Sequence, residues 1–381
     1  MDEFYRETWI EVQLDAISSN VKNMYNHLPN DTDLMVAVKA NGYGHGAYET
    51  ATIALESGAT ALATALLDEA IYLRKQGITA PILVLGYVPP NYAQIAADYN
   101  ISLTVFQKEW VDTAKTVLTS SLPVHIKCDT GMGRLGVRTV RELEELLNSV
   151  KRNEFFHLEG IFTHFAAADE QNSSYYLQQL RKFQSFLEIV KEKPRWIHAS
   201  NSAASLRFAD GLFDLVRSGI STYGLTPSID IVSELPFPLQ PALSLHTRLT
   251  HVKKVAKGAK ISYGGTYTAK EDEWIGTIPI GYADGWLRLL QGQSVLIDGI
   301  RVPIVGRICM DQCMIKLPQK YPVGSLVTLI GNQGEEHITV NEIAEKLGTI
   351  NYEVICILSH RLPRVYKKGK KIVQIKNELF R

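Results

Sequence analysis

The sequence predicts an α/β protein with an amino-terminal (β/α)8 barrel and a carboxyl-terminal, mainly-β domain. Three observations indicate this fold class. Short apolar runs alternate with helical patterns over the first two thirds of the chain. A proline-containing stretch at 233–241 breaks the alternation, and strand-like stretches dominate after it. The expected domains are residues 1–235 and 236–381, with roughly the first ten residues able to pack with the second domain.

Eight apolar runs are the candidate barrel strands. They carry few polar residues, which suits parallel strands covered on both faces. They span residues 34–40, 61–65, 81–86, 101–105, 123–128, 158–163, 195–199 and 213–217. Eight strands alternating with helices indicate a closed barrel. An open doubly wound sheet is the alternative, which the lack of a G-x-G-x-x-G motif after the first strand makes weaker.

Helical patterns fill the gaps between the apolar runs. Residues 67–76 precede a glycine, a common helix stop, and Pro89-Pro90 opens another helix. Residues 139–150 and 173–190 carry apolar side chains at helical spacing. These segments supply the helices that connect the strands of the barrel.

The second domain should be mainly β. Its strand-like stretches are residues 244–255, 274–280, 294–297, 302–305 and 326–330. One helix interrupts them, because Thr339 and Glu342 have the spacing of a capping box that opens a segment ending near Leu347.

Composition excludes several functional classes. Forty basic residues balance forty acidic ones, so net charge predicts neither a nucleic-acid nor a membrane partner. The amino terminus lacks the apolar run of a secretory signal, and no segment approaches the ~20 apolar residues of a membrane helix. A cytoplasmic enzyme is expected. Neither a disulfide framework nor a zinc site is expected from the cysteines, Cys128, Cys309, Cys313 and Cys356.

The first predicted strand ends at Lys39, within the stretch AVKANGYGHG. Catalytic groups of barrels lie at the carboxyl ends of strands. A desolvated lysine amine there can form a Schiff base with an aldehyde. Simple exposure of a strand-end lysine is the alternative. The alternate glycines that follow permit close approach of the backbone to a ligand.

Other polar residues follow later strands. The loop DTGMGRLG (129–136) holds Arg134, whose guanidinium suits a carboxylate, although a surface salt bridge is the commoner role of such a residue. His164 follows the sixth strand as a structural or proton-handling residue. Ser202, Gly219 and Ile220 follow the seventh and eighth strands, where barrels often bind phosphate. The lysine amine, the arginine that binds a carboxylate and the phosphate-binding residues would then all lie at one mouth of the barrel.

The chain resembles alanine racemases, a family that depends on pyridoxal 5'-phosphate (PLP). AVKANGYGHG is similar to the family's cofactor-lysine signature. The other similar blocks, in family order, are DTGMGRLG, the Arg217-Ser218-Gly219 turn, SYGGTYTA (262–269), GYADG (281–285) and GRICMDQ (306–312). The resemblance covers essentially the whole chain.

The resemblance implies a role for each site residue. Lys39 would hold the cofactor covalently, and Arg217 would face its pyridine nitrogen. The remaining cofactor contacts would come from Tyr43, Asn201, Ser202, Gly219, Ile220 and Tyr352. Arg134 would bind the substrate carboxylate, braced by Lys127, which can be a carbamate in relatives. Tyr263 would be the second catalytic base, with His164 beside it. Substrate would also meet Met310, Asp311 and Tyr282.

The implied reaction interconverts L-alanine and D-alanine, supplying D-alanine for peptidoglycan. It would proceed through an external aldimine with PLP and two-base proton transfer by Lys39 and Tyr263, with no metal ion. The family is dimeric, and each site would pair Lys39 of one chain with the partner's Tyr263. Bulky rings at Tyr263, Tyr282 and Tyr352 would narrow the entrance and favour a substrate with a methyl side chain.

Three other functions remain open at this point. One is another PLP enzyme of this architecture, either a broad-specificity amino acid racemase or a basic amino acid decarboxylase. A second is a non-catalytic PLP-binding barrel, which the β domain carrying Tyr263 opposes. A third is a barrel enzyme that acts on sugar phosphates without PLP.

Overall fold

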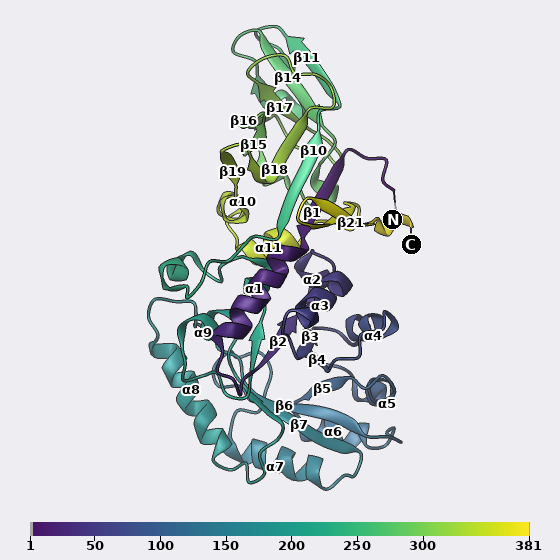
Figure 1. Cartoon of the computed structure of the whole chain (residues 1–381), viewed down its shortest axis with the longest axis vertical. Helices are drawn as coiled ribbons and strands as arrows, with labels where there is room; N and C mark the ends of the chain where they lie inside the picture. The colour runs from purple at the N-terminus through teal and green to yellow at the C-terminus, as the bar shows by residue number, and fades with distance from the viewer. Residues whose placement is uncertain (1–2, 381) are drawn as a thin grey trace. The chain divides into compact units, whose positions relative to one another are not determined.

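The computed structural model describes residues 3–380, which form two compact units. One unit spans Ala16–Pro241, and the other combines the chain up to Asp15 with the chain from Ala242 onward. Figure 1 shows a barrel ringed by helices in the first unit and a large sheet in the second. The predicted fold class is therefore confirmed.

A closed ring of parallel strands forms the core of the barrel unit. The strands, in order around the ring, are β2 (Asp33–Ala37), β3 (Ala61–Thr64), β4 (Ile82–Val84), β5 (Ser102–Val105), β6 (Leu122–Lys127), β7 (Phe156–Phe162), β8 (Trp196–His198) and β9 (Leu215–Ser218). β9 pairs in parallel with β2 and closes the ring, which rules out the open-sheet alternative. Every residue of β3 and β5 is buried, as strands covered on both faces require.

Helices cover the outside of the barrel. They are α1 (Leu14–His27, in this unit from Ala16 onward), α2 (Lys39–Tyr43), α3 (Ala47–Glu56), α4 (Leu67–Lys75), α5 (Ala93–Asp98), α6 (Lys108–Ala114), α7 (Val140–Lys151), α8 (Ser174–Leu187) and α9 (Ser202–Arg207), with 3-10 turns η1 (Pro90–Tyr92), η2 (Ile220–Tyr223) and η3 (Ile229–Glu234). α4, α7 and α8 match predicted segments. α7 begins at a capping box, in which the Thr139 hydroxyl accepts a hydrogen bond from the amide of Glu142 at 3.2 Å.

The first barrel strand ends two residues before Lys39, not at Lys39 as predicted. Lys39 instead begins α2, most of which is a left-handed turn. The positive φ angles there are 52° at Ala40, 52° at Asn41, 60° at Gly42 and 51° at Tyr43. Each non-glycine residue in this conformation costs roughly 1–2 kcal/mol. The surrounding structure must therefore hold the turn in place.

Two side chains hold the left-handed turn. Glu69 accepts a hydrogen bond from the amide of Ala40 at 2.7 Å with one oxygen, and from the amide of Ala65 at 2.8 Å with the other. Asn41 accepts from the amide of Ala47 at 3.0 Å. The Glu69 carboxylate thus links, by hydrogen bonds, the backbone beside Lys39 to the neighbouring β3–α4 junction.

The second unit, called the β unit below, is built on an eleven-stranded sheet. The order along it is β11 (His251–Val255), β14 (Glu273–Ile278), β17 (Cys313–Leu317), β16 (Ile300–Val305), β15 (Ser294–Ile297), β18 (Leu326–Gln333), β10 (Leu243–Arg248), β1 (Thr8–Gln13), β20 (Arg364–Lys368) and β21 (Lys371–Lys376), with β19 (Glu336–Ile338) paired to β18. β12 (Lys260–Ile261) and β13 (Tyr267–Thr268) form a separate pair.

The helices of the β unit are α10 (Val340–Leu347) and α11 (Asn351–Cys356), and its 3-10 turns are η4 (Tyr263–Gly265), η5 (Tyr282–Asp284), η6 (Arg288–Leu290) and η7 (Glu378–Phe380). The predicted capping box of α10 is present, since the Thr339 hydroxyl accepts from the amide of Glu342 at 3.0 Å. The predicted stretch 244–255 is two strands, β10 and β11, which lie far apart in the sheet order.

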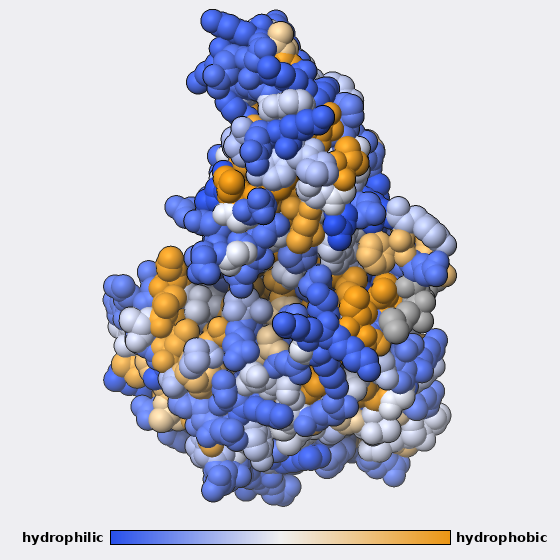
Figure 2. Space-filling view, turned by 45° about the horizontal axis from the view of Figure 1, so that its top comes forward, coloured by the Kyte–Doolittle hydropathy of each residue, from blue (hydrophilic) through white to orange (hydrophobic). Residues whose placement is uncertain are grey.

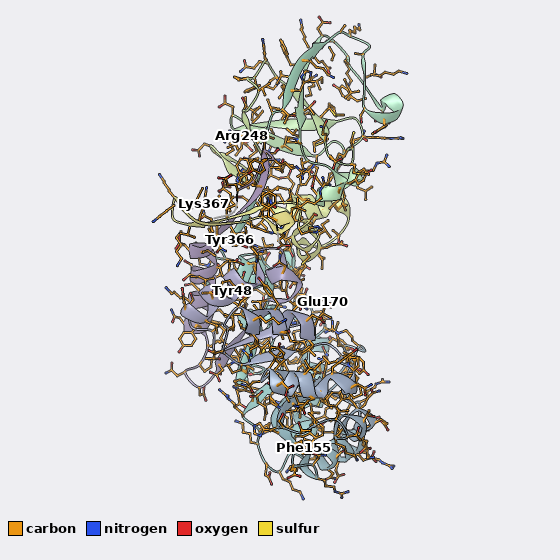
Figure 3. The ribbon with its side chains drawn as sticks, turned by 90° about the vertical axis from the view of Figure 1, so that its right-hand side faces the viewer. Tyr48, Phe155, Glu170, Arg248, Tyr366 and Lys367 are labelled. Carbon is orange, nitrogen blue, oxygen red and sulfur yellow. The ribbon has the colours of Figure 1, made fainter. Side chains whose placement is uncertain are left out.

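The two ends of the chain meet within the β unit. β1 lies between β10, its antiparallel neighbour, and β20, its parallel neighbour. Figure 3 labels the two basic residues that tie β1 to these strands. The Arg248 guanidinium lies 5.6 Å from the centre of the Trp9 ring, and Lys367 Nζ lies 2.6 Å from a carboxylate oxygen of Glu11. Figure 1 shows both termini on the same side of this unit.

The surface carries no extended apolar face in the view of Figure 2, where hydrophilic residues dominate and apolar residues form separate groups. Within residues 3–380, no helix combines the length and the apolar character needed to cross a membrane.

Candidate active site

The candidate site residues of the barrel unit gather at one end of the barrel. Phe155 precedes β7 and marks the opposite, amino-terminal end, whereas Tyr48 and Glu170 follow β2 and β7 (Figure 3). At the carboxyl-terminal end lie the predicted residues Lys39, Lys127, His164, Ser202 and Arg217, which end or follow β2, β6, β7, β8 and β9. Parallel strands bring their carboxyl ends together, so these side chains share one mouth.

Basic side chains crowd this mouth. Lys127 is the last residue of β6, is only 4% exposed, and its amine lies 4.2 Å from the centre of the Phe162 ring. Burial, and then the charges of Arg217 and Arg134, hold the pKa of Lys127 well below its ordinary value. Lys127 therefore gives up its proton more readily than an ordinary lysine, and the charges of two arginines contribute to this.

Arg134 is positioned by a loop that folds back on itself. The Asp129 carboxylate accepts hydrogen bonds from the amides of Gly131 at 3.1 Å and Gly133 at 2.9 Å. Gly136 closes the loop against Asp129, where a Cβ at residue 136 would lie 2.4 Å from the Asp129 amide nitrogen. The glycines of this motif serve close backbone packing, which leaves Arg134 exposed at the tip.

Arg217 is the most constrained cation of the mouth. It is 5% exposed, and one of its terminal nitrogens donates to the carbonyls of Thr163 and Ala199, both at 2.8 Å. The same nitrogen lies 3.3 Å from Nδ1 of His164. Burial, and then Arg134, lower the pKa of Arg217 to about 9, which leaves it charged at neutral pH.

Burial and neighbouring charges both disfavour the protonated form of His164. Burial, followed by the charge of Arg217, lowers the pKa of its imidazole well below the ordinary value, and Lys127, Arg134 and Lys39 act in the same direction. The predicted residues Lys39, Lys127, Arg134, His164 and Arg217 are thus close enough to influence one another electrostatically. Such an excess of positive charge suits an anionic ligand.

A second group of residues forms a small polar cradle. The Ser202 hydroxyl oxygen accepts a hydrogen bond from the amide of Gly219 at 2.8 Å and lies 3.5 Å from the amide nitrogen of Ser221. A Cβ at residue 219 would lie 3.0 Å from the Tyr43 hydroxyl and 3.7 Å from the Ser202 hydroxyl. Glycine therefore leaves a space bordered by two hydroxyl groups at the start of η2. Ile220, the first residue of η2, is fully buried.

Asn201 has a structural task that the sequence did not reveal. It is the N-cap of α9, where its side-chain oxygen accepts from the amide of Ala204 at 3.1 Å. Its side-chain nitrogen donates to the carbonyl of Phe165 at 3.1 Å. Asn201 thus fixes the helix whose first residue is Ser202.

The other predicted site residues lie in the β unit, where three sequence blocks pack together. The amide of Ala283 donates to the carbonyl of Met310 at 3.1 Å, which joins GYADG to GRICMDQ. The Ser262 hydroxyl donates to the carbonyl of Arg307 at 2.6 Å, which joins SYGGTYTA to the same block. The loops that carry the predicted residues Tyr263, Tyr282, Met310 and Asp311 are therefore neighbours in this unit.

Exposure distinguishes these residues from an ordinary core. Tyr263 is 69% exposed in η4, Met310 is 53% exposed, and Tyr282 is 38% exposed. The Asp311 carboxylate lies 2.7 Å from a terminal nitrogen of Arg361. Tyr352 lies in the first turn of α11 and is half-buried. The exposed Tyr263 ring suits a contact with another surface or a ligand.

Three residues near the site were not found by sequence reasoning. His125, His198 and Glu159 lie inside the barrel strands, and both histidines are fully buried. Arg217 donates a hydrogen bond to Nδ1 of His198 at 2.7 Å. A sequence signal did exist, because a polar residue within the apolar runs PVHIKC and RWIHA needs a partner.

The buried histidines predict how stability depends on pH. Burial is the largest cause that lowers the pKa values of His125, His164 and His198, so each takes up a proton less readily in the folded protein than in the unfolded chain. In the unfolded chain each takes up a proton below about pH 6.5. Stability is therefore fully present above that pH and falls on acidification, by about 1.4 kcal/mol per pH unit for each histidine.

We expect the urea midpoint of the cofactor-free protein to fall between pH 7 and pH 5. Replacing His164 with glutamine should reduce the slope of stability against pH by about 1.4 kcal/mol per pH unit. Replacing His157, an exposed histidine of β7, controls for the loss of one imidazole. An equal slope in H164Q and the unaltered protein would contradict the lowered pKa of His164.

Comparisons with known proteins agree over the whole chain. The family profile "Alanine racemase, N-terminal domain" matches residues 12–227, and "Alanine racemase, C-terminal domain" matches residues 242–366. An alanine racemase of Geobacillus kaustophilus is 53% identical, with 100% of each chain covered. Alanine racemase 1 of Bacillus subtilis is 51% identical over 99% of this chain and 97% of that protein.

Solved structures show the same similarity. A crystal structure of alanine racemase from Bacillus anthracis with bound L-Ala-P superposes with a TM-score of 0.97 at 52% identity, and all of both chains is covered. A histidine racemase from Leuconostoc mesenteroides gives a TM-score of 0.90 at 33% identity, covering 96% of this chain and 100% of that one. The fold is thus shared by racemases that differ in their named amino acid.

Proposed function

Because the chain belongs to the alanine racemase family and is an isomerase acting on alanine, we propose that it works with pyridoxal 5'-phosphate held covalently by Lys39. One observation carries the proposal for the cofactor. The Lys39 amine, a cationic mouth and a hydroxyl-lined cradle lie together at the carboxyl-terminal end of one barrel. The amine suits an aldehyde, the cationic mouth suits a substrate carboxylate, and the cradle suits a phosphate.

The cradle fits a phosphate group. The space left by Gly219 is bordered by the hydroxyls of Tyr43 and Ser202, and the amide of Gly219 lies at its edge. Backbone amides and hydroxyls at the start of a helical turn are the donors that phosphate prefers. The residues proposed to hold the cofactor are Lys39, Tyr43, Asn201, Ser202, Arg217, Gly219, Ile220 and Tyr352. When bound, PLP supplies an electron-accepting ring that makes the α-proton of an attached amino acid acidic.

The residues of the chain would then bind the substrate and move its proton. Arg134 would grip the alanine carboxylate with its guanidinium. Lys39 would hold and return the proton on one face of the α-carbon, and Tyr263 would do so on the other. Inversion of the centre needs a base on each face, which is why a single base is not enough. Arg217, which remains charged at neutral pH, would face the pyridine nitrogen of the cofactor.

We also propose that the site is shared between two subunits. Tyr263 is 69% exposed, as expected for a residue that completes a site in a second copy of the chain. In this arrangement Lys39 of one protomer works with the partner's Tyr263. Met310, Asp311 and Tyr282 lie on loops that neighbour the loop of Tyr263 in the β unit and would approach the substrate beside it.

Lys127 is proposed to carry a carbamate. Its lowered pKa favours the unprotonated amine, whose lone pair can attack carbon dioxide and release one proton. The product would be an anion placed between Arg217 and Arg134, and it would brace Arg134 against the substrate. We expect a new carbonyl signal in the carbon-13 NMR spectrum after incubation with labelled bicarbonate. The signal should be lost in K127A, and its persistence in that variant would contradict the assignment.

Removing the Ser202 hydroxyl should weaken cofactor binding. A hydrogen bond to a charged group contributes about 1.5–3 kcal/mol, so S202A should raise the Kd for PLP by about 10- to 100-fold. Titration of the cofactor absorbance measures this Kd. S205A is the matched control, because Ser205 lies on the same helix and its hydroxyl donates to the carbonyl of Asn201 at 2.8 Å. Equal Kd values for the two variants would argue against the cradle.

The substrate assignment is tested by assaying the PLP-loaded protein with several amino acids. We expect D-alanine from L-alanine, and much slower turnover of serine, lysine, arginine and histidine. Histidine is included because a racemase named for it shares this fold. Release of carbon dioxide from lysine or arginine would favour the decarboxylase. PLP binding without any D-alanine would favour the non-catalytic alternative.

A further inference from the structure

A line of hydrogen bonds runs from Arg217 through the interior of the barrel. Nδ1 of His198 lies 2.7 Å from a terminal nitrogen of Arg217, and Nε2 of His198 lies 2.8 Å from Nδ1 of His125. Nε2 of His125 lies 3.0 Å from a carboxylate oxygen of Glu159, to which the Ser102 hydroxyl donates at 2.5 Å. The line links five strands, since these residues lie on β9, β8, β6, β7 and, for Ser102, β5.

The chemistry of its two ends fixes the direction of every bond. An arginine has only donors, so Nδ1 of His198 must accept and its Nε2 must carry the proton. His125 must then accept at Nδ1 and carry its own proton at Nε2, which it donates to Glu159. A carboxylate suits this order, because it accepts without donating. The two tautomers are thereby determined jointly by Arg217 and Glu159.

Burial favours the neutral form of the two imidazoles. Both are fully buried, and burial followed by the charge of Arg217 lowers the pKa of His198 well below its ordinary value. Burial also lowers the pKa of His125 despite the opposing hydrogen bond to Glu159. Burial alone would raise the pKa of Glu159, but its hydrogen bonds with His125 and Ser102 leave that pKa below the ordinary value. The line therefore joins a cation and an anion through two rings whose protonated forms are disfavoured by burial.

The backbone is shaped to place Glu159 in this line. The register between β6 and β7 pairs Val124 with Leu158 and His125 with Gly160, so Glu159 is the extra residue of a β-bulge. Bulges redirect a side chain, and this one turns a carboxylate toward the barrel interior. Gly160 leaves room for the imidazole, since a Cβ there would lie 2.4 Å from Nδ1 of His125.

We propose that Glu159 is a positioning residue that acts through His125 and His198 to set which Arg217 protons remain for the cofactor. The inference rests on the proposed function only for the role of Arg217 toward the pyridine nitrogen. One terminal nitrogen of Arg217 donates to the carbonyls of Thr163 and Ala199. The other terminal nitrogen uses one of its protons in the hydrogen bond to His198. If His198 carried its proton on Nδ1, that guanidinium proton would face another donor and Arg217 would have to rotate.

The proposal is tested by replacing Glu159 in the PLP-loaded protein and reading the histidine tautomers by nitrogen-15 NMR. E159M removes the acceptor, so Nε2–H of His125 loses its partner. Only Arg217 then opposes the reversed order of protons, and a mixture of the two tautomers should replace the single one. We expect kcat to fall by about 10- to 100-fold, with a much smaller change in KM. E159Q keeps a side-chain oxygen that accepts, so it should retain both tautomers and keep kcat within about threefold of the unaltered protein.

Two further variants separate the proposal from general damage. G160A leaves Glu159 in place but pushes His125 away, and it should reproduce the tautomer change and the loss of kcat. E154M replaces an exposed glutamate just before β7 and should change neither quantity. Unchanged tautomers in both E159M and G160A would overturn the proposal, as would disordered tautomers with an unchanged kcat. The NMR result does not need substrate, so absent racemisation by the unaltered protein would count only against the proposed function.

Discussion

K39A is expected to lose at least about 10⁴-fold in kcat for alanine racemisation, because one substitution removes both the covalent attachment of the cofactor and one of two bases. The left-handed turn after β2 fixes the backbone on which Lys39 is carried, and so fixes where the attaching amine starts. Racemisation is followed by the circular dichroism of alanine. The aldimine-like absorbance of the bound cofactor should disappear in the same variant.

The control for this variant is K75A, which removes an exposed lysine at the end of α4 and should leave both signals unchanged. A small primary amine added to K39A should restore part of the activity, since the space left by the side chain admits it. Reduction with borohydride and mass mapping identifies the attachment site directly. A pyridoxyl group on any lysine other than Lys39 would refute the assignment.

Y263F is expected to reduce kcat by about 10²- to 10⁴-fold, the usual contribution of a positioned acid or base. L-alanine and D-alanine have equal free energies, so kcat/KM must fall equally in both directions. Exchange of the α-proton with solvent distinguishes the two faces. In heavy water, the enantiomer served by Lys39 should still acquire deuterium in Y263F, whereas the other enantiomer should not. Proton NMR of the recovered alanine measures this exchange.

Y267F is the matched control, because Tyr267 lies four residues further on and its hydroxyl donates to Glu273 at 2.5 Å. That hydrogen bond, together with burial, raises the pKa of Tyr267 to about 12, so it is not a base near neutral pH. Y267F should exchange the α-protons of both enantiomers. Equal deuterium uptake from both enantiomers in Y263F would exclude Tyr263 as the base for one face.

The sequence predicted the barrel because its strands are buried on both sides and therefore read as apolar runs. β3 and β5 show this directly, since every residue in each is buried. Motif glycines also indicated the loops correctly. Short helices of small residues, such as α9, were not predicted, because their apolar pattern is too brief to distinguish from a loop.

The missed features depend on contacts between distant segments. The left-handed conformation of Ala40 and Asn41 is held by Glu69, a residue of α4 that nothing in the local sequence links to Lys39. The line of His198, His125 and Glu159 likewise joins different strands. The orientation of Glu159 depends on a β-bulge, which no sequence pattern predicts. Periodicity reports which face of a segment is buried, but not which polar partners meet there.

The place of β1 in the sheet has a consequence for synthesis on the ribosome. β1 lies between β10 and β20, so the β unit needs strands from the first and the last twenty residues of the chain. The barrel segment, by contrast, has fully emerged before the carboxyl-terminal strands are made. The barrel is therefore able to fold during translation, whereas the amino-terminal strand must wait until β20 has been made before both of its neighbours in the sheet are present.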